Sequence, residues 1–390
     1  MIITKNEKVL LTLTDMMYQR SHTEQECANS IAFLGEERTV NVVDEELDQI
    51  DIKPFDICRN REDKRRMLIA VMIACGVRGE KDIKPEILHR NNDLITALYH
   101  YTKELKPDYI TNNPFISKLS LQPGSDSVFT FTNHIINAYV PFTYGSQKQY
   151  EGMEVQPVAY FNEAFRYPVI MKDGKTLFSM NGQTFLDYDA LIRPVSKDVL
   201  ICGLKAGYLA YMFQRKQSVT SITVVEHDAE VIRLFKEQIL PQFENPDKIH
   251  IIQDDAYDYL QSHEKDYNWI INDLYQNFHD NIDSLIRMKA IENAYPHTRF
   301  LYWEEGNMLD NIRAALLADM AASLAEDYEK ALEQIVTDEK SKEFILLIHQ
   351  LFEDYRIDKV KDYTDLYDDK KLQKIVKEQS LQYVKRYNKI

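Results

Sequence analysis

The chain contains 390 residues and has a formal net charge of −15 at pH 7. Its length is sufficient for roughly two or three domains and a large hydrophobic core. The acidic balance argues against nonspecific binding to nucleic acid, whose phosphates attract basic surfaces, and would favour cationic partners such as polyamines. The alternative, which is favoured, is that the acidic residues of the surface serve only to keep the protein in solution.

The sequence predicts a cytoplasmic protein without a bound metal. Its four cysteines, Cys27, Cys58, Cys75 and Cys202, are widely separated and form no Cys-x-x-Cys pair, which indicates reduced thiols and no zinc site. The first residues lack the basic and then apolar plan of a signal peptide. The longest apolar run, residues 67–77, is about half as long as a membrane span requires, so no membrane partner is expected.

The first 106 residues are predicted to form a helical domain. Residues 65–74 have the pattern of a buried helix that stops near Gly76 or Gly79, and residues 87–105 carry another apolar stripe. A basic cluster between them could bind an anion, although a solvated helix start is favoured; its members are Arg59, Arg61, Lys64, Arg65 and Arg66. Residues 107–167 are richer in Pro, Asn and aromatic residues, which predicts a linker with a small strand-rich element.

Between residues 198 and 273, short apolar runs alternate with amphipathic helical patterns. The runs occupy residues 198–202, 221–225, 248–252 and 269–271. This alternation predicts right-handed crossovers and a parallel sheet, which binds ligands at the carboxyl ends of its strands. The first run leads into a turn from Gly203 to Gly207, where glycines would let the backbone approach a ligand and the next helix would offer its amides.

Acidic residues follow the second and third runs. Glu226 suits a bidentate bond to ribose hydroxyls, and Asp254 or Asp255, followed by the small Ala256, could accept a hydrogen bond from an adenine amino group. The alternative is that these acids only cap the helices that follow them. Three acidic strand ends in succession are more than capping requires, so nucleotide binding is favoured.

The C-terminal part of the chain begins after a further predicted strand at residues 299–303. That strand ends at Glu304 and Glu305, whose paired carboxylates could supply a general base, although a helix start or a solvent-facing pair is favoured. Residues 309–390 are predicted to form a charged helical module that packs on its own core or on another subunit. In the second case the protein would be a homo-oligomer.

Residues 168–308 resemble the class I S-adenosylmethionine-dependent methyltransferase fold and, within it, the spermidine synthase-like branch. In that family the glycine turn is followed by an acidic-x-acidic strand end, an Asp-Ala pair and a strand ending in Asp. The matching segments here are Glu226-His-Asp228, Asp255-Ala256 and Asp273. The family also has a β-hairpin before the turn, with an Asp-Gly and a downstream Gln, which match Asp173-Gly174 and Gln183.

The sequence departs from the family pattern in two places. Lys205 occupies the middle position of the turn, where the family has glycine, and would bring a positive charge near the methionine part of the cofactor. It could instead pair with the cofactor carboxylate or with a phosphate of another nucleotide. The family's Asp-x-x-Asp-Pro after the fourth strand is also missing, because no acid follows Asp273 until Asp280. These departures argue against authentic spermidine synthesis.

The predicted fold is therefore an α/β, Rossmann-like methyltransferase sheet preceded by a β-hairpin, with helical modules at 1–106 and 309–390. The resemblance implies a transferase that binds S-adenosylmethionine, or its decarboxylated form, and passes a methyl or aminopropyl group to a small-molecule acceptor such as an amine. Asp273 would orient or deprotonate the acceptor. The implied cofactor contacts are Gly203, Lys205, Gly207, Glu226, Asp228, Asp254, Asp255 and Ala256.

Two other functions remain open. The first is a Rossmann protein whose cofactor loop has degenerated at Lys205 and which serves as a scaffold or ligand sensor. The second is a nicotinamide-dependent oxidoreductase, which fits less well because the turn lacks a full dinucleotide fingerprint.

Overall fold

The computed structural model describes residues 1–36, 47, 53–77, 83–118, 120, 128–151, 153–263, 266–274 and 282–387. Its contacts divide the chain into two compact units. The sheet unit comprises residues 1–18 and 190–390, and the N-terminal unit comprises residues 19–189. Gly79 and the segment that follows Leu274 up to Asp280 lie outside the described residues.

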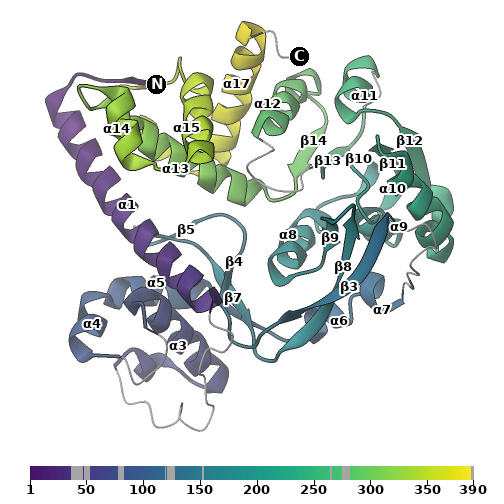
Figure 1. Cartoon of the computed structure of the whole chain (residues 1–390), viewed down its shortest axis with the longest axis horizontal. Helices are drawn as coiled ribbons and strands as arrows, with labels where there is room; N and C mark the ends of the chain where they lie inside the picture. The colour runs from purple at the N-terminus through teal and green to yellow at the C-terminus, as the bar shows by residue number, and fades with distance from the viewer. Residues whose placement is uncertain are drawn as a thin grey trace. The chain divides into compact units, whose positions relative to one another are not determined.

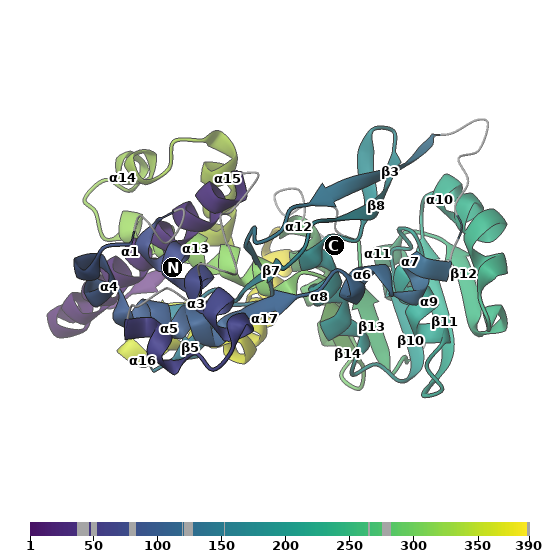
Figure 2. The ribbon, with the colours of Figure 1, turned by 90° about the horizontal axis from the view of Figure 1, so that it is seen from below.

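A five-stranded parallel sheet forms the centre of the sheet unit, in the order β12-β11-β10-β13-β14. Figure 2 shows the five strands side by side in this order. Their bounds are Lys197–Cys202 for β10, Val219–Glu226 for β11, Ile249–Gln253 for β12, Trp269–Asn272 for β13 and Arg299–Tyr302 for β14. The predicted parallel α/β sheet is confirmed.

The direction of chain progression along this sheet reverses at β10. From β10 the chain passes to β11 and β12 on one side, and then returns to β13 and β14 on the other. Such a switch point opens a crevice at the carboxyl ends of the two central strands. Buried residues fill the end of β10 and the whole of β13, which explains why the sequence shows continuous apolar runs there instead of alternation.

Helices connect the strands and continue to the C-terminus. The connecting helices are α9 (Tyr208–Gln214), α10 (Ala229–Leu234), α11 (Ala256–Ser262) and α12 (Ile282–Ile291). The C-terminal helices are α13 (Glu305–Ser323), α14 (Tyr328–Ile335), α15 (Glu339–Leu351), α16 (Val360–Asp365) and α17 (Asp369–Tyr387). The short strand β1 (Ile2–Ile3) pairs in parallel with β15 (Arg356–Ile357).

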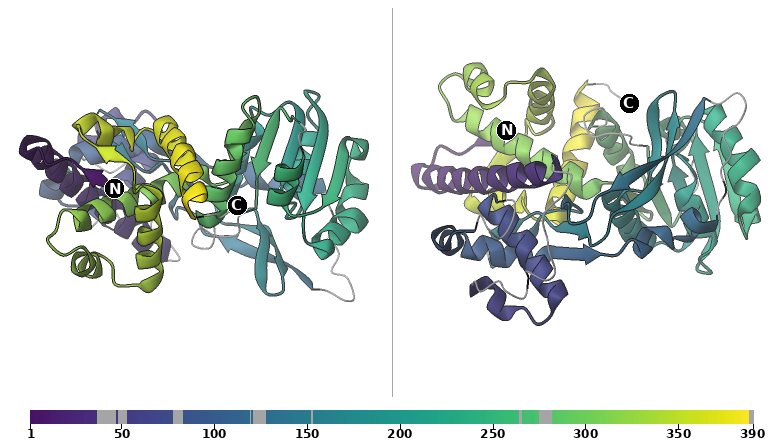
Figure 3. Two further views of the ribbon diagram at one scale, coloured as in Figure 1. Left: turned by 90° about the horizontal axis from the view of Figure 1, so that it is seen from above. Right: turned by 60° about the horizontal axis from the view of Figure 1, so that its bottom comes forward.

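A largely buried ion-pair network joins the C-terminal helices to the sheet. Lys289 Nζ of α12 lies 2.7 Å from Glu305 Oε1 at the start of α13, and Gln373 of α17 donates to the other oxygen of Glu305 at 3.0 Å. Lys377 of α17 lies 3.1 Å from Glu292, which follows α12. Helix α17, yellow in Figures 1 and 3, therefore packs against α12 as part of the sheet unit.

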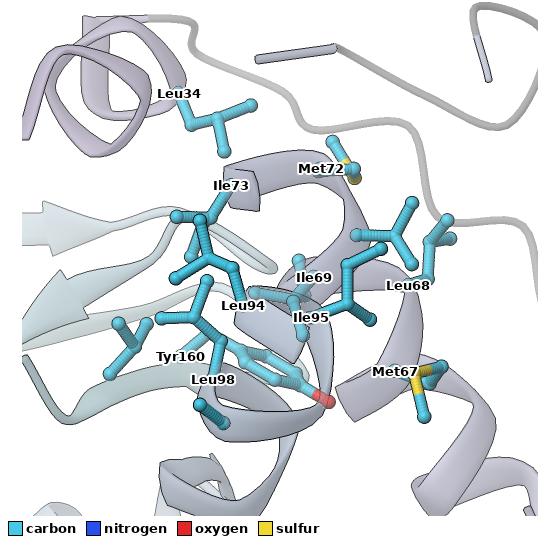
Figure 4. Packing of buried hydrophobic residues seen from close by; sticks show 14 of the residues in the cluster. Leu34, Met67, Leu68, Ile69, Met72, Ile73, Leu94, Ile95, Leu98 and Tyr160 are labelled. Carbon is cyan, nitrogen blue, oxygen red and sulfur yellow. The ribbon is translucent and has the colours of Figure 1, made fainter. Parts of the chain in front are cut away.

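The N-terminal unit has a helical core. Its helices include α3 (Arg61–Cys75), α4 (Pro85–Arg90) and α5 (Asn92–Tyr101), together with residues 19–36 of the long helix α1 (Glu7–Glu36). Figure 4 shows Leu68, Ile69 and Met72 of α3 packed with Leu98 and Tyr160. Helix α3 ends at Gly76, whose left-handed φ of 64° closes the last turn, so the predicted stop near this glycine is confirmed.

Strands complete the N-terminal unit. One sheet has the order β2-β7-β4 and another is the antiparallel β3-β8-β9. Strands β8 and β9 form a hairpin around Asp173-Gly174, and β5 pairs with β6. The bounds are Thr102–Leu105 for β2, Phe129–Ile136 for β3, Phe142–Thr143 for β4, Lys148–Tyr150 for β5, Met153–Val155 for β6, Val158–Phe161 for β7, Phe165–Lys172 for β8 and Lys175–Ser179 for β9. Helices α6 (Asp108–Thr111), α7 (Pro114–Lys118) and α8 (Gly182–Ile192) flank these strands in sequence.

Two members of the basic cluster are used internally. Arg65 donates from Nε and from one terminal nitrogen to the two oxygens of Glu104, each at 2.6 Å. Arg66 donates to the carbonyl oxygens of Thr102 and Tyr99. The expected solvated helix start is therefore wrong for Arg65 and Arg66, because both side chains tie α3 to the segment that forms α5 and β2.

We expect Arg65→Met to lower the free energy of unfolding by about 3 kcal/mol, because the Glu104 carboxylate would stay buried without its bidentate partner. Arg59→Met, at an exposed position just before α3, is the control and should change it by less than about 0.5 kcal/mol. Urea denaturation followed by circular dichroism measures both values. Equal effects of the two substitutions would contradict this account of Arg65.

Candidate functional site

The turn between β10 and α9 depends on two glycines. Gly203 and Gly207 have φ values of 93° and 76°. A Cβ atom on Gly203 would lie 2.7 Å from the carbonyl oxygen of Asp273, and one on Gly207 would lie 2.2 Å from the ring of Phe235. Glycine is therefore required at both positions by conformation and by close packing, and the turn passes in contact with the end of β13.

Lys205, between these glycines, also has a left-handed conformation, with a φ of 45°. The backbone at this position thus has the conformation that favours glycine, although a side chain is present, and the strain costs roughly 1–2 kcal/mol. The Lys205 ammonium nitrogen lies 2.7 Å from Asp273 Oδ1 and 3.4 Å from the centre of the Trp303 ring. The cation is held between a carboxylate and an aromatic face, and both contacts stabilise it.

Glu226 connects the turn to the end of β11. Its side chain is largely buried, Oε2 accepts a hydrogen bond from Leu204 N–H at 2.9 Å, and Oε1 accepts one from Asp228 N–H at 2.9 Å. His227 Nδ1 lies 3.2 Å from the same Oε1. Because a carboxylate oxygen has two lone pairs, Oε2 retains capacity for a further donor, whereas Oε1 already has Asp228 N–H and His227 Nδ1 as neighbours. The carboxylate is therefore fixed in orientation.

The other acids predicted near the cofactor cap helices in the structure. Asp228 accepts hydrogen bonds from the first amides of α10, and Asp255 accepts them from the first amides of α11. Asp254 is half-buried and its Oδ1 accepts from Asp255 N–H at 2.9 Å. Ala256 is buried as the first residue of α11. Capping thus occupies part of the hydrogen-bonding capacity of Asp228 and Asp255.

Backbone hydrogen bonds align four of these positions along one edge of the sheet. Gly203 N–H donates to Val225 at 2.8 Å, and Asp273 N–H donates to Cys202 at 2.8 Å. Asp254 N–H donates to the Glu226 carbonyl at 3.2 Å. The predicted residues at the carboxyl ends of β10, β11, β12 and β13 are therefore neighbours in space, and the switch point, where open α/β sheets bind ligands, lies between β10 and β13.

Two residues that follow β14 also belong to this edge. Trp303 N–H donates to the Asn272 carbonyl at 3.0 Å, which brings its indole to Lys205. The sequence analysis missed Trp303, although one of only two tryptophans at a strand end was a usable signal. Burial raises the pKa of the Glu304 carboxyl; Lys205 lowers this pKa and Asp273 raises it further. Glu304 is thus an acid whose proton is held more tightly than usual, next to the Lys205–Asp273 pair.

Glu304 and Glu305 do not act as a matched pair. Glu305 accepts from Lys289 and Gln373, as part of the network that fixes α17. Glu304 has a left-handed φ of 57°, and the charges that shift its pKa are those of Lys205 and Asp273. Of the two carboxylates, Glu304 alone is therefore considered for the chemistry of the site.

The described residues offer neither a metal centre nor a membrane anchor of the helical kind. Within the described ranges, no three His, Cys, Asp or Glu side chains are arranged to hold a metal ion. Among the helices in the same part of the chain, none combines the length and the apolar character needed to cross a bilayer.

Gly203→Ala should lower the free energy of unfolding by about 3 kcal/mol, because strain at positive φ adds to overpacking against the Asp273 backbone. The matched control is Gly174→Ala in the β8–β9 turn, where φ is also positive, at 74°, but no atom lies within 4 Å of the added Cβ. That control should cost about 1 kcal/mol, from strain alone. Similar losses in urea denaturation would contradict the proposed close contact with β13.

Glu304→Gln should raise the melting temperature at pH 7.5 and change it little at pH 4. Because the folded pKa of Glu304 is raised, the folded protein binds this proton more tightly than the unfolded chain does. Stability from this group is therefore present at low pH and is lost as pH rises through the folded pKa. Calorimetric melting at both pH values, with the exposed Glu326→Gln as control, tests this sign. A rise in melting temperature that is equal at both pH values would refute it.

Residues 187–291 match the family model of the spermine/spermidine synthase domain. None of the curated proteins compared with this chain matches it. Three similar solved structures are the spermidine synthase from Thermotoga maritima, a spermidine synthase in complex with the transition state analogue AdoDATO, and the SAH-bound methyltransferase PaMTH1 from Podospora anserina.

These similarities are distant. Sequence identity is 15% for the Thermotoga maritima enzyme, which is matched over 50% of this chain and 71% of its own, with a TM-score of 0.29. The AdoDATO complex has 16% identity over 46% of this chain and 63% of its own, with a TM-score of 0.26. The Podospora anserina methyltransferase has 16% identity over 46% and 73%, with a TM-score of 0.28. The matched domain includes the glycine turn, Glu226 and Asp273, and over these residues the resemblance to the spermidine synthase-like branch is confirmed.

Proposed function

We propose that the carboxyl edge of the five-stranded sheet binds S-adenosylmethionine or decarboxylated S-adenosylmethionine. The chain would then be a spermidine synthase-like transferase that passes a methyl or aminopropyl group to a small-molecule acceptor. The observation that carries this proposal is Glu226, a largely buried carboxylate fixed beside the glycine turn inside the matched domain.

The nucleoside half of such a ligand fits the residues at this edge. Two backbone N–H groups hold Glu226, and Oε2 keeps a lone pair for a ribose hydroxyl, while Oε1 keeps one when His227 Nδ1 carries no proton. Asp254 is one strand further along and is half-buried, so its carboxylate could accept from the amino group of an adenine. Gly203, Gly207 and Ala256 add little side-chain bulk at this edge.

Transfer requires an acceptor that loses a proton. When bound, a sulfonium cofactor supplies an electrophilic carbon and a neutral thioether leaving group. The acceptor's proton would pass to a protein carboxylate as its electron pair attacks that carbon and the thioether leaves. Asp273 can orient the acceptor, but its carboxylate is already engaged by the Lys205 ammonium at 2.7 Å. Glu304, with its raised pKa, is the better proton acceptor of the two.

A second function is favoured by the same ion pair. If Asp273 is permanently engaged by Lys205, the site can bind a nucleoside without transferring a group, and the protein would act as a ligand sensor or scaffold. Mass spectrometric assay for S-adenosylhomocysteine or methylthioadenosine release, with a panel of amine acceptors, separates the two functions. Product release that falls in Asp273→Asn would favour the transferase.

Calorimetric titration tests nucleoside binding directly. We expect S-adenosylmethionine, decarboxylated S-adenosylmethionine or S-adenosylhomocysteine to bind in roughly the micromolar range, and NAD not to bind. Glu226→Gln should weaken binding at least about tenfold, because one acceptor for the ribose is replaced by a donor. The control Glu237→Gln, an exposed carboxylate that pairs with Arg233, should leave affinity unchanged. A folded wild-type protein that gives no heat with any of the three nucleosides would sink the proposal.

A further inference from the structure

The Lys205–Asp273 ion pair determines the charge at the switch point. Both side chains are nearly buried, with 10% and 4% of their surfaces exposed, and the Lys205 nitrogen also lies 3.4 Å from the centre of the Trp303 ring. A buried carboxylate beside an aromatic face is a favourable environment for an ammonium or a sulfonium group. In this protein the ammonium of Lys205, which belongs to the glycine turn, already contacts both the Asp273 carboxylate and the Trp303 ring.

The backbone supports this interpretation of Lys205. A lysine at φ 45° is strained, and its long side chain loses rotamer freedom when it is fixed. Such a conformation persists when surrounding contacts determine it, and here the contacts are the carboxylate of Asp273 and the indole of Trp303. These contacts thus hold the Lys205 ammonium in place at the carboxyl edge of the sheet.

We infer that Lys205 is an internal cation that occupies the place of a ligand's positive charge, so that this site selects adenosyl ligands with a neutral sulfur over those with a sulfonium. The inference rests on the proposed nucleoside binding at this edge. An unpaired Asp273 would give this edge a negative charge that attracts a sulfonium, whereas the Lys205–Asp273 ion pair is neutral overall.

The test compares S-adenosylmethionine with S-adenosylhomocysteine, because the two differ only by one methyl group and the charge that it places on sulfur. Calorimetric titrations are made at one pH on the wild type, on Lys205→Met and on Lys205→Met/Asp273→Asn. Methionine keeps the unbranched shape, most of the length of the side chain and the strain of its Cβ while removing the charge. The double variant removes the same lysine without freeing a carboxylate.

We expect the wild type to bind S-adenosylhomocysteine at least as tightly as S-adenosylmethionine. Lys205→Met should shift the affinity ratio toward S-adenosylmethionine by about tenfold or more, and the double variant should lose most of that shift. Melting temperatures establish that each variant is folded. If Lys205→Met does not fold, Lys205→Gln, which retains a hydrogen-bond donor for Asp273, replaces it with the same expected direction.

Three results would overturn the inference, and they separate it from the proposed function. A wild type that prefers S-adenosylmethionine, or a ratio unchanged in the folded lysine variant, removes the role of Lys205 but leaves nucleoside binding intact. No binding of either ligand by the wild type or the lysine variant removes both.

Discussion

Close packing between the glycine turn and the end of β13 is the constraint on which the candidate site depends. The space where Gly203 would carry a Cβ atom is filled by the Asp273 backbone, so the turn and the strand are in direct contact. This contact brings the Lys205 ammonium to the Asp273 carboxylate, and Gly207 makes an equivalent approach to Phe235 on the other side of the turn. Glu226 then fixes the turn to β11 through Leu204. Three neighbouring strands are thereby held in register where a ligand would bind.

The sheet itself was predictable from sequence because its signal is local and strong. Strands buried on both faces give continuous apolar runs, and the intervening helices force parallel crossovers, so the α/β sheet followed from residues 198–273. The internal roles of Arg65 and Arg66 were not predictable, because their acceptors are supplied by the distant Glu104 and by backbone carbonyls. An isolated sequence window shows that a charge is present, but it does not show which carboxylate or carbonyl packing will bring to it.

In the candidate site, too, the sequence showed which residues are present but not which partners they contact. Asp228 and Asp255 were identified at strand ends, but a helix cap and a ligand-binding acid use the same residue type at the same position, so sequence alone left both roles open. The charge of Lys205 was evident, whereas its partner was not, because the indole of Trp303 comes from a strand that lies far along the chain. For Glu304 and Glu305 the sequence left a catalytic pair open and favoured a helix start or a solvent-facing pair; α13 does begin at Glu305, and the left-handed conformation of Glu304 separates the environments of the two carboxylates.

The presence of lysine where the turn adopts a glycine conformation bears on how the crevice is used. Glycine would relieve the strain but would leave the nearly buried Asp273 carboxylate without its cation, and an uncompensated buried charge costs several kcal/mol, more than the roughly 1–2 kcal/mol of strain. Lys205 therefore stabilises the folded site when no ligand is bound. Without this lysine, Asp273 would need a cationic ligand to neutralise its charge. On the inference that this edge binds an adenosyl ligand, folding stability and affinity for a cationic ligand would compete for the Asp273 carboxylate, and Lys205 would give the advantage to stability.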